Sequence, residues 1–198
     1  PTRRSSDLYG GAVDAKGDFW FTARSGPYLF HVDAETLAVE RFTTPNNPYG
    51  VAIDSFGNPF VADYHAGPGV DAVTRFNVDT KAFEQIVGGA GRYRGIQIDT
   101  KGVGWVAGNV PCRLVKVDTQ TDTILDNAIP LPGCNDPVGV SIDEEGDVWV
   151  VDRGASLAYE IDAETHEVKN TLKNLIGPYT YSDMTGGSLR LVQGPKPG

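Results

Sequence analysis

Charged side chains that could do chemistry stand close together in two loop-like stretches of the chain. Asp63 and His65 are two residues apart in a glycine-rich stretch, and Arg153 directly follows Asp152. An imidazole beside a carboxylate could act as a general base, and both groups could ligate a metal ion. We therefore predict His65 as a candidate catalytic residue, and Asp63 and Asp152 as candidate ligands of Mg²⁺ or Ca²⁺.

Simpler interpretations of the same residues stay open. A histidine in a long surface loop is more often solvated than catalytic, and Asp152 with Arg153 could form only a local ion pair. His31 is expected in a strand and His166 in a turn, and both look ordinary. The chain lacks the order of a Ser-His-Asp triad, the spacing of paired zinc-binding cysteines and a phosphate-binding loop.

A phrase that occurs four times places these loops in a larger pattern. An aspartate closes each copy, a glycine follows three positions later, and an aromatic residue comes three positions after the glycine. The aspartates are Asp14, Asp54, Asp99 and Asp143, so successive copies are 40, 45 and 44 residues apart. A period of this length predicts a modular array.

Each repeat indicates four short antiparallel strands. Alternating apolar residues on both sides of the Asp-x-x-Gly turn predict a hairpin, and two more strands are expected around a polar outer turn. Four strands in about forty residues make one blade of a β-propeller. No stretch longer than a turn has the helical period. We predict an all-β chain, a β-propeller fragment with blades at about 9–47, 48–91, 92–136 and 137–177.

The two ends of the chain are expected to differ from the blades. Residues 1–8 have no relation to the repeat and match a translated sequencing adapter, so they are interpreted as a non-native leader, with an ordinary disordered leader as the alternative. Residues 178–198 contain a fifth Asp-x-x-Gly turn at Asp183. They predict the first hairpin of a fifth blade or the lead into a further segment, and we expect the parent protein to be longer.

The repeated aspartates favour a structural role over a metal site. Each opens a turn, where a carboxylate can accept hydrogen bonds from backbone N–H groups two or three residues ahead. The sequence from Asp14 to Asp18 lacks the alternating ligands of a calcium loop. We predict the same structural role for the aspartates before the outer turns, which are Asp33, Asp79, Asp118 and Asp162.

The blades differ at one end, which we call the rim. The rim consists of the loops between the second and third strands and of the lead-in loops before each first strand. Its polar residues suit an anion, a sugar or a metal with sparse ligands. Besides Asp63, His65 and Asp152, the predicted ligand-binding residues of the rim are Arg24, Tyr49, Asn109 and Arg153.

The chain has two cysteines, and their positions favour a disulfide. Cys112 begins a predicted third strand and Cys134 lies in the next lead-in loop, so both fall at the rim. A bridge across 22 residues would stabilise the fold by about 3 kcal/mol. It would also indicate an exported protein, at an extracellular, periplasmic or cell-surface location. Two unrelated buried thiols are the alternative.

The composition of the chain narrows the range of possible binding partners. The formal charge of −9 argues against a nucleic-acid surface and against adhesion to anionic lipid. No apolar run reaches the roughly 18 to 20 residues of a membrane helix. We expect a monomer whose partner is a protein, a glycan, a peptide or a small molecule.

Three segments resemble the blades of the streptogramin lyase (virginiamycin B lyase) family and, more broadly, of NHL-type propellers. These are residues 17–22, 48–58 and 137–152, and the similarity extends over residues 9–172. The resemblance implies a bacterial β-propeller. For the lyases it also implies a magnesium-assisted elimination that opens a macrocyclic depsipeptide with a histidine and glutamates at the channel mouth.

This chain departs from the lyase pattern at the positions that matter for activity. The family's second strand often ends Trp-Phe-Thr-Glu, whereas Ala23 follows the same three residues here. The equivalent positions hold Asp63, Gly108 and Asp152, and none of them is a glutamate. If the lyase site exists, we therefore expect it outside these blades, with Asp63 and Asp152 as the shorter substitutes that remain.

Two functions of different class follow. The preferred one is a binding scaffold that presents its rim to a partner, and it predicts an exposed aromatic patch of Tyr49, Tyr64 and Tyr93. The alternative is a metal-dependent lyase or lactone hydrolase, and it predicts rim carboxylates that converge on the channel axis with His65 turned inward. A calcium site of the gluconolactonase type is a third possibility without a clear counterpart in the residues.

Overall fold

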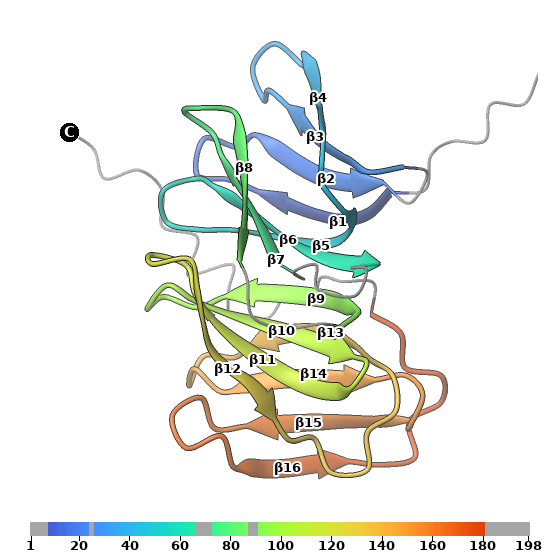
Figure 1. The fold of residues 1–198 in the computed structure, drawn as a ribbon. Helices are drawn as coiled ribbons and strands as arrows, with labels where there is room; N and C mark the ends of the chain where they lie inside the picture. Colours follow the sequence, from blue (N-terminus) through green and yellow to red (C-terminus); the bar gives the residue numbers. More distant parts are fainter. Residues whose placement is uncertain (1–7, 24–25, 66–72, 87–90, 181–198) are drawn as a thin grey trace, which may run out of the picture.

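The protein consists of four four-stranded antiparallel β-sheets that follow one another in chain order (Figure 1). The computed structural model describes residues 8–23, 26–65, 73–86 and 91–180, and all structural statements refer to these. Within them there is no helix, and so none that could span a membrane. The predicted all-β fold with four blades is confirmed. The predicted fifth turn at Asp183 lies outside the described residues.

Each sheet is a meander of consecutive strands. The first strands of neighbouring sheets contact one another, so they are the innermost. Blade 1 comprises β1 (Leu8–Val13), β2 (Phe19–Ala23), β3 (Tyr28–Val32) and β4 (Val39–Thr43). Blade 2 comprises β5 (Asn47–Ile53), β6 (Pro59–His65), β7 (Val73–Asn77) and β8 (Ala82–Ile86). Blade 3 comprises β9 (Tyr93–Ile98), β10 (Val103–Asn109), β11 (Cys112–Asp118) and β12 (Thr123–Ile129). Blade 4 comprises β13 (Pro137–Ile142), β14 (Val148–Asp152), β15 (Leu157–Ile161) and β16 (Val168–Leu172).

The turn between the first two strands is built in the same way in every blade. In blade 1, Asp14 Oδ1 accepts hydrogen bonds from the backbone N–H groups of Lys16 (2.9 Å) and Asp18 (3.0 Å). Gly17 takes a φ of 89°, in the left-handed region that favours glycine. Gly57, Gly102 and Gly146 take φ angles of 86°, 80° and 89° in the other blades. The structural role predicted for these four aspartates is therefore what the structure shows.

The second oxygen of the same aspartate anchors the aromatic residue of the next strand. The indole N–H of Trp20 donates to Asp14 Oδ2 at 3.0 Å, and Trp105 donates in the same way to Asp99 at 3.1 Å. Trp149 repeats the bond, and in blade 2, where phenylalanine replaces tryptophan, the amide of Asn58 donates to Asp54 instead. Each turn is thus tied to the core of its own blade.

The outer turns, between the third and fourth strands, are also capped by side chains. Asp33 Oδ1 accepts hydrogen bonds from the backbone N–H groups of Glu35 (3.1 Å) and Thr36 (2.7 Å), and Asp118 and Asp162 cap their turns alike. In blade 2 the capping residue is Asn77, which accepts from the N–H of Asp79. The prediction for Asp79 was wrong, because the capping position comes two residues earlier in that blade.

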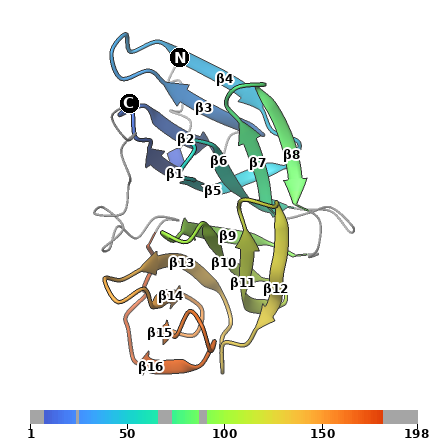
Figure 2. The same cartoon turned by 90° about the vertical axis from the view of Figure 1, so that its left-hand side faces the viewer.

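Packing between neighbouring sheets forms three apolar clusters. Trp20 and Leu29 of blade 1 pack against Val61 and Phe76 of blade 2. Similar clusters lie between blades 2 and 3 and between blades 3 and 4, where Trp105 is 1% exposed. Figure 2 shows the sheets spread around the inner strands β1, β5, β9 and β13. The core therefore lies between the blades.

The inner strands approach each other closely at a glycine. A Cβ atom added to Gly95 in β9 would stand 2.5 Å from the carbonyl oxygen of Val138 in β13. Real Cβ atoms essentially never come so close to backbone. Only glycine fits this contact without displacing one of the two strands.

Candidate functional site

The structure places a cavity of about 370 Å³ at the rim. This rim cavity is bordered by residues of all four blades: Tyr9, Ala23, Gly26, Asn47, Pro48, Tyr49, Tyr64, Arg94 and Arg153. Both kinds of turn lie at the opposite end of the sheets, because the first and third strands run from the rim toward them. The loops that differ between blades therefore border the cavity, as the sequence predicted.

Arg94 occupies the centre of the polar network around the cavity. Its guanidinium donates hydrogen bonds to Tyr49 Oη at 3.2 Å and to Asn109 Oδ1 at 2.8 Å, and it pairs with Asp136 Oδ1 at 2.9 Å. Burial disfavours the charged form, but the hydrogen bond to Tyr49 and the charge of Asp136 outweigh it and raise the pKa of Arg94. One buried cation thus joins blades 2, 3 and 4.

Tyrosines form the aromatic part of the cavity wall. The rings of Tyr9 and Tyr49 meet edge to face with centroids 4.3 Å apart, and those of Tyr49 and Tyr64 lie 5.4 Å apart. Arg94 stands 4.9 Å from the centre of the Tyr64 ring, which is a cation–π distance. Beyond β16, Tyr179 reaches back, and its hydroxyl lies 2.9 Å from those of both Tyr9 and Tyr49. Burial raises the pKa of Tyr49, so its phenol stays protonated.

Asp136 connects the buried part of the network to the surface. It pairs with Arg94 on one side and with Arg153 on the other, and the amide of Asn109 also donates to it. The Arg153 side chain is 47% exposed, whereas that of Arg94 is 9% exposed. Arg153 also lies over the ring of Tyr179 at 5.5 Å. The local ion pair expected between Asp152 and Arg153 is not formed, because Arg153 pairs with Asp136 instead.

Both candidate metal ligands are fully buried and hold their own loops. Asp63 Oδ2 accepts hydrogen bonds from the amide of Asn46 at 3.0 Å and from the hydroxyl of Thr74 at 2.7 Å. Asp152 accepts three backbone N–H bonds, from Asn135, Asp136 and Ala155. These contacts are those of carboxylates that shape loops.

Two predicted site residues have no described side chain. His65 is the last residue of β6, and its backbone pairs with Asn47 in β5, which borders the cavity. Arg24 lies outside the described residues. Their predicted roles stay predictions.

The exposed aromatic patch expected of a binding scaffold does not form. Tyr49 is 3% exposed and Tyr93 is 1% exposed. The Tyr93 hydroxyl accepts a hydrogen bond from Arg113 at 3.1 Å. Tyr49 and Tyr64 line a cavity instead of a flat surface. The aromatic residues of the rim therefore form walls.

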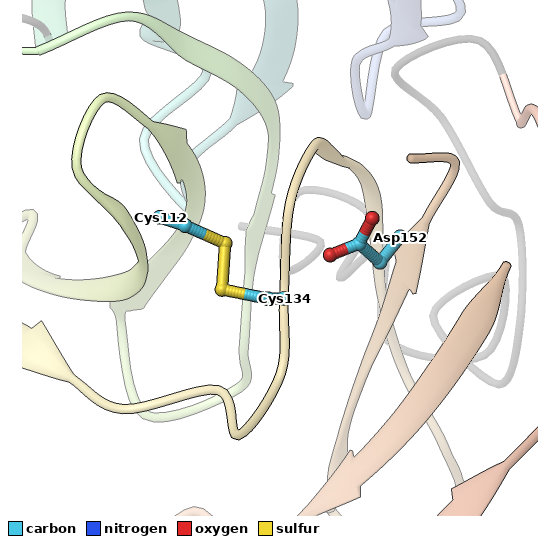
Figure 3. A group of neighbouring side chains, drawn as sticks. All are labelled: Cys112, Cys134 and Asp152. Carbon is cyan, nitrogen blue, oxygen red and sulfur yellow. A yellow bond between two sulfur atoms is a disulfide. The ribbon is translucent and has the colours of Figure 1, made fainter. Parts of the chain in front are cut away.

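Two clusters of side chains among the described residues have the spacing of metal ligands. Cys112, Cys134 and Asp152 form one of them, and Figure 3 shows the two sulfurs joined with the carboxylate to one side. The cysteines form a disulfide with their Cα atoms 6.2 Å apart, as the sequence favoured, so they offer no thiolate. Asp143, Asp147 and Glu160 form the other cluster. There Lys169 pairs with Asp147, and Trp149 donates to Asp143.

Sequence reasoning missed Arg94, Asp136 and Tyr9 as residues of the site. A signal was present, because the position before the repeated glycine varies: it holds Tyr9, Tyr49, Arg94 and Val138. Three of these four border the cavity. A variable position next to an invariant one at the innermost strand is the pattern to search for in such a repeat.

Comparisons with known proteins support the fold. No protein-family model and no curated protein matches the chain. A streptogramin B lyase structure is similar with 18% identity and a TM-score of 0.73, over 89% of this chain and 57% of that one. A catalytically inactive virginiamycin B lyase from Staphylococcus aureus, crystallised with quinupristin, is similar with 17% identity and a TM-score of 0.70, over 85% and 56%.

A third similar structure is an auxiliary nutrient binding protein from Bacteroides ovatus, with 13% identity and a TM-score of 0.68, over 90% of this chain and 43% of that one. The chain therefore has a β-propeller fold, and its structural resemblance to streptogramin lyase is confirmed at the level of the fold. It spans a little over half the length of the lyase structures.

Proposed function

We propose that this protein is an exported binding scaffold that takes a ligand in the rim cavity. The observation that carries the proposal is the cavity itself, in which tyrosine and arginine side chains from different blades meet. Its volume of about 370 Å³ lies in the range of small-molecule sites, which is roughly 300 to 1,000 Å³. A glycan unit, a peptide side chain or a small molecule would fit.

The fixed wall supports binding. Hydrogen bonds join Tyr49 to Arg94 and Tyr179, so these groups are held in place before any ligand arrives. A preorganised site loses little conformational entropy on binding. One structural relative is described as a nutrient binding protein, and another is the extracellular domain of a putative two component system.

The alternative function, a lyase or lactone hydrolase that uses Mg²⁺ or Ca²⁺, has less support in the geometry. A metal ion would have to compete with the three backbone N–H groups that donate to Asp152, and with Asn46 and Thr74, which donate to Oδ2 of Asp63. Any of these bonds that the metal displaced would leave a buried polar group without its partner. The described geometry therefore favours binding.

Export is supported by the disulfide between Cys112 and Cys134. Disulfides persist in oxidising compartments and are rare in the cytosol. A thiol-trapping measurement on protein from its native host would test this. The bridge should be fully formed, and free thiols in both positions would contradict export.

The binding function is tested with the 198-residue chain. A library of sugars, amino acids and small acids is screened by thermal shift, and each hit is titrated by calorimetry against the wild type and Tyr64→Ala. Phe56→Ala is the matched control, because Phe56 is an aromatic residue of the same blade, 73% exposed in the turn at the opposite end.

A ligand of the rim cavity should bind the wild type and Phe56→Ala equally and bind Tyr64→Ala at least tenfold more weakly. The loss of one stacked aromatic contact accounts for that change. Hits that bind all three proteins alike would place the ligand elsewhere. A screen without any hit would contradict the proposal.

A further inference from the structure

The charged residues that border the rim cavity are opposite in sign to the net charge of the whole chain. The formal charge of the protein is −9, yet the charged residues that border the cavity are Arg94 and Arg153. A third guanidinium, that of Arg92, lies 5.9 Å from the Tyr64 ring, and Arg92 is exposed. Asp136 is the one carboxylate paired with these arginines among the described residues.

The other two carboxylates described near the rim, Asp63 and Asp152, are not among the residues that border the cavity. Asp63 and Asp152 are fully buried, and their hydrogen bonds come from their own loops. The charged side chains that border the cavity itself are therefore both guanidinium groups. In a strongly acidic protein, a cavity lined in this way is a local site of attraction for anions.

Arg153 is the group most available to a ligand. Its side chain is 47% exposed and uses Nη2 on Asp136. A guanidinium has five N–H donors in a rigid fork. Among the described residues no partner contacts Nε or Nη1 of Arg153, so one face of the fork can receive a carboxylate.

The aromatic walls require a second property of the ligand. Tyr9, Tyr49 and Tyr64 are among the residues that line the cavity. Flat apolar surface stacks on such rings, whether it is the C–H face of a sugar ring or an aromatic ring. An inorganic anion would leave this surface without a partner.

We propose that the rim cavity binds a small monoanion that joins a carboxylate to a flat apolar body, either a hexuronic acid or an aromatic acid. The carboxylate pairs with Arg153, and the flat body lies on the tyrosines. A monoanion fits better than a phosphate dianion, because Asp136 already neutralises one of the two lining arginines. This inference rests on the proposed binding function and narrows it to one ligand class.

Two acid and neutral pairs test the inference by calorimetry: D-glucuronate against D-glucose, and benzoate against benzyl alcohol. At least one acid should bind the wild type about tenfold more tightly than its neutral partner, in line with one charge-assisted hydrogen-bonded pair. Binding of D-glucuronate would indicate a hexuronic acid as the ligand, and binding of benzoate would indicate an aromatic acid. Raising the salt concentration should weaken the binding of the acid and leave the affinity for the neutral compound unchanged.

Arg153→Gln should remove the preference for the acid and keep the affinity for the neutral partner. Arg41→Gln is the matched control, because Arg41 is exposed and lies over the ring of Tyr28 at 4.6 Å on the outside of blade 1. Circular dichroism checks that both variants fold. Equal affinity for acid and neutral compound, or a preference that survives Arg153→Gln, would overturn the inference.

The two experiments distinguish a failure of the carboxylate inference from a failure of the proposed binding function. If neutral hits from the screen bind the wild type and lose affinity in Tyr64→Ala while neither acid binds, the cavity is a binding site of another class and the carboxylate inference is wrong. If no compound binds in either experiment, both proposals fail.

Discussion

The two ends of the blades are built on different principles. At the turn end, each blade repeats the same bonds within itself, from Asp14 to Trp20 in blade 1 and from Asp99 to Trp105 in blade 3. At the rim, the bonds run between blades, and Arg94 in blade 3 contacts Tyr49 in blade 2 and Asp136 beside blade 4.

This difference separates scaffold from site. A contact that recurs in every blade serves a need that every blade shares, which is to close a hairpin and fix an aromatic side chain. A contact that occurs once serves the one place where it occurs. The rim is therefore the part of the molecule whose residues could have been selected for a ligand.

The largest effect is expected at the turn end. Trp105→Ala removes a side chain that is 1% exposed and leaves Asp99 without its indole donor, so it should lower the free energy of unfolding by about 3 to 5 kcal/mol. Urea denaturation measures the change. Phe56→Ala, with a residue 73% exposed, should stay within about 0.5 kcal/mol. Similar losses for both variants would contradict the assignment of the core.

A smaller loss is expected from the rim network. Asp136→Ala leaves the Arg94 guanidinium, with a side chain 9% exposed, without its carboxylate and should cost about 3 kcal/mol. Glu164→Ala is the control, because its side chain is 80% exposed and its ion pair with Lys101 should contribute almost nothing. If both variants unfold at the same urea concentration, the rim does not hold the blades together.

Low pH should lower the stability of the fold in part through the aspartates of the outer turns. Backbone hydrogen bonds, above all from Thr36, hold the pKa of Asp33 below its ordinary value of 3.8. The stability from this shift is fully present above pH 3.8 and is lost as the pH falls through the folded-state pKa.

Asp33→Asn should therefore lose less stability than the wild type between pH 6 and pH 3. Asn77 does the same work without charge in blade 2, so the variant should fold normally. Urea midpoints measured across this pH range check the prediction. Parallel curves for the two proteins would show that Asp33 does not contribute to acid sensitivity.

The smallest effect is a gain in stability. Leu37 is 72% exposed, so its side chain makes few packing contacts. Its φ of 57° lies in the left-handed region, which is strained for a residue with a side chain. Leu37→Gly should raise the free energy of unfolding by about 0.5 to 1 kcal/mol. Leu172→Gly, in a strand, should lower it. A loss in both variants would indicate that Leu37 packs more than its exposure suggests.

The turn end could be predicted from the sequence, because the same residue pattern occurs in all four blades. Asp14 and Gly17 have counterparts in every blade, and their roles follow from turn chemistry alone. The one error there, Asp79 in place of Asn77, arose because an amide can cap a turn as well as a carboxylate.

The rim could be predicted only in part. The sequence indicated which loops meet and included Tyr49 and Arg153 among their residues. It did not show that Arg94 and Asp136 would pair, because the two are 42 residues apart in sequence and meet only when the blades pack. Partners in different blades follow from the three-dimensional arrangement, which a single sequence does not state.

The contact at Gly95 concerns the angle between blades. With no side chain at this point, β9 and β13 can converge on their inner side while the outer strands stay apart, so blades 3 and 4 meet as a wedge. A larger residue would force the inner strands apart and bring the two sheets closer to parallel. Gly95 thereby sets how sharply the chain curves from blade 3 to blade 4.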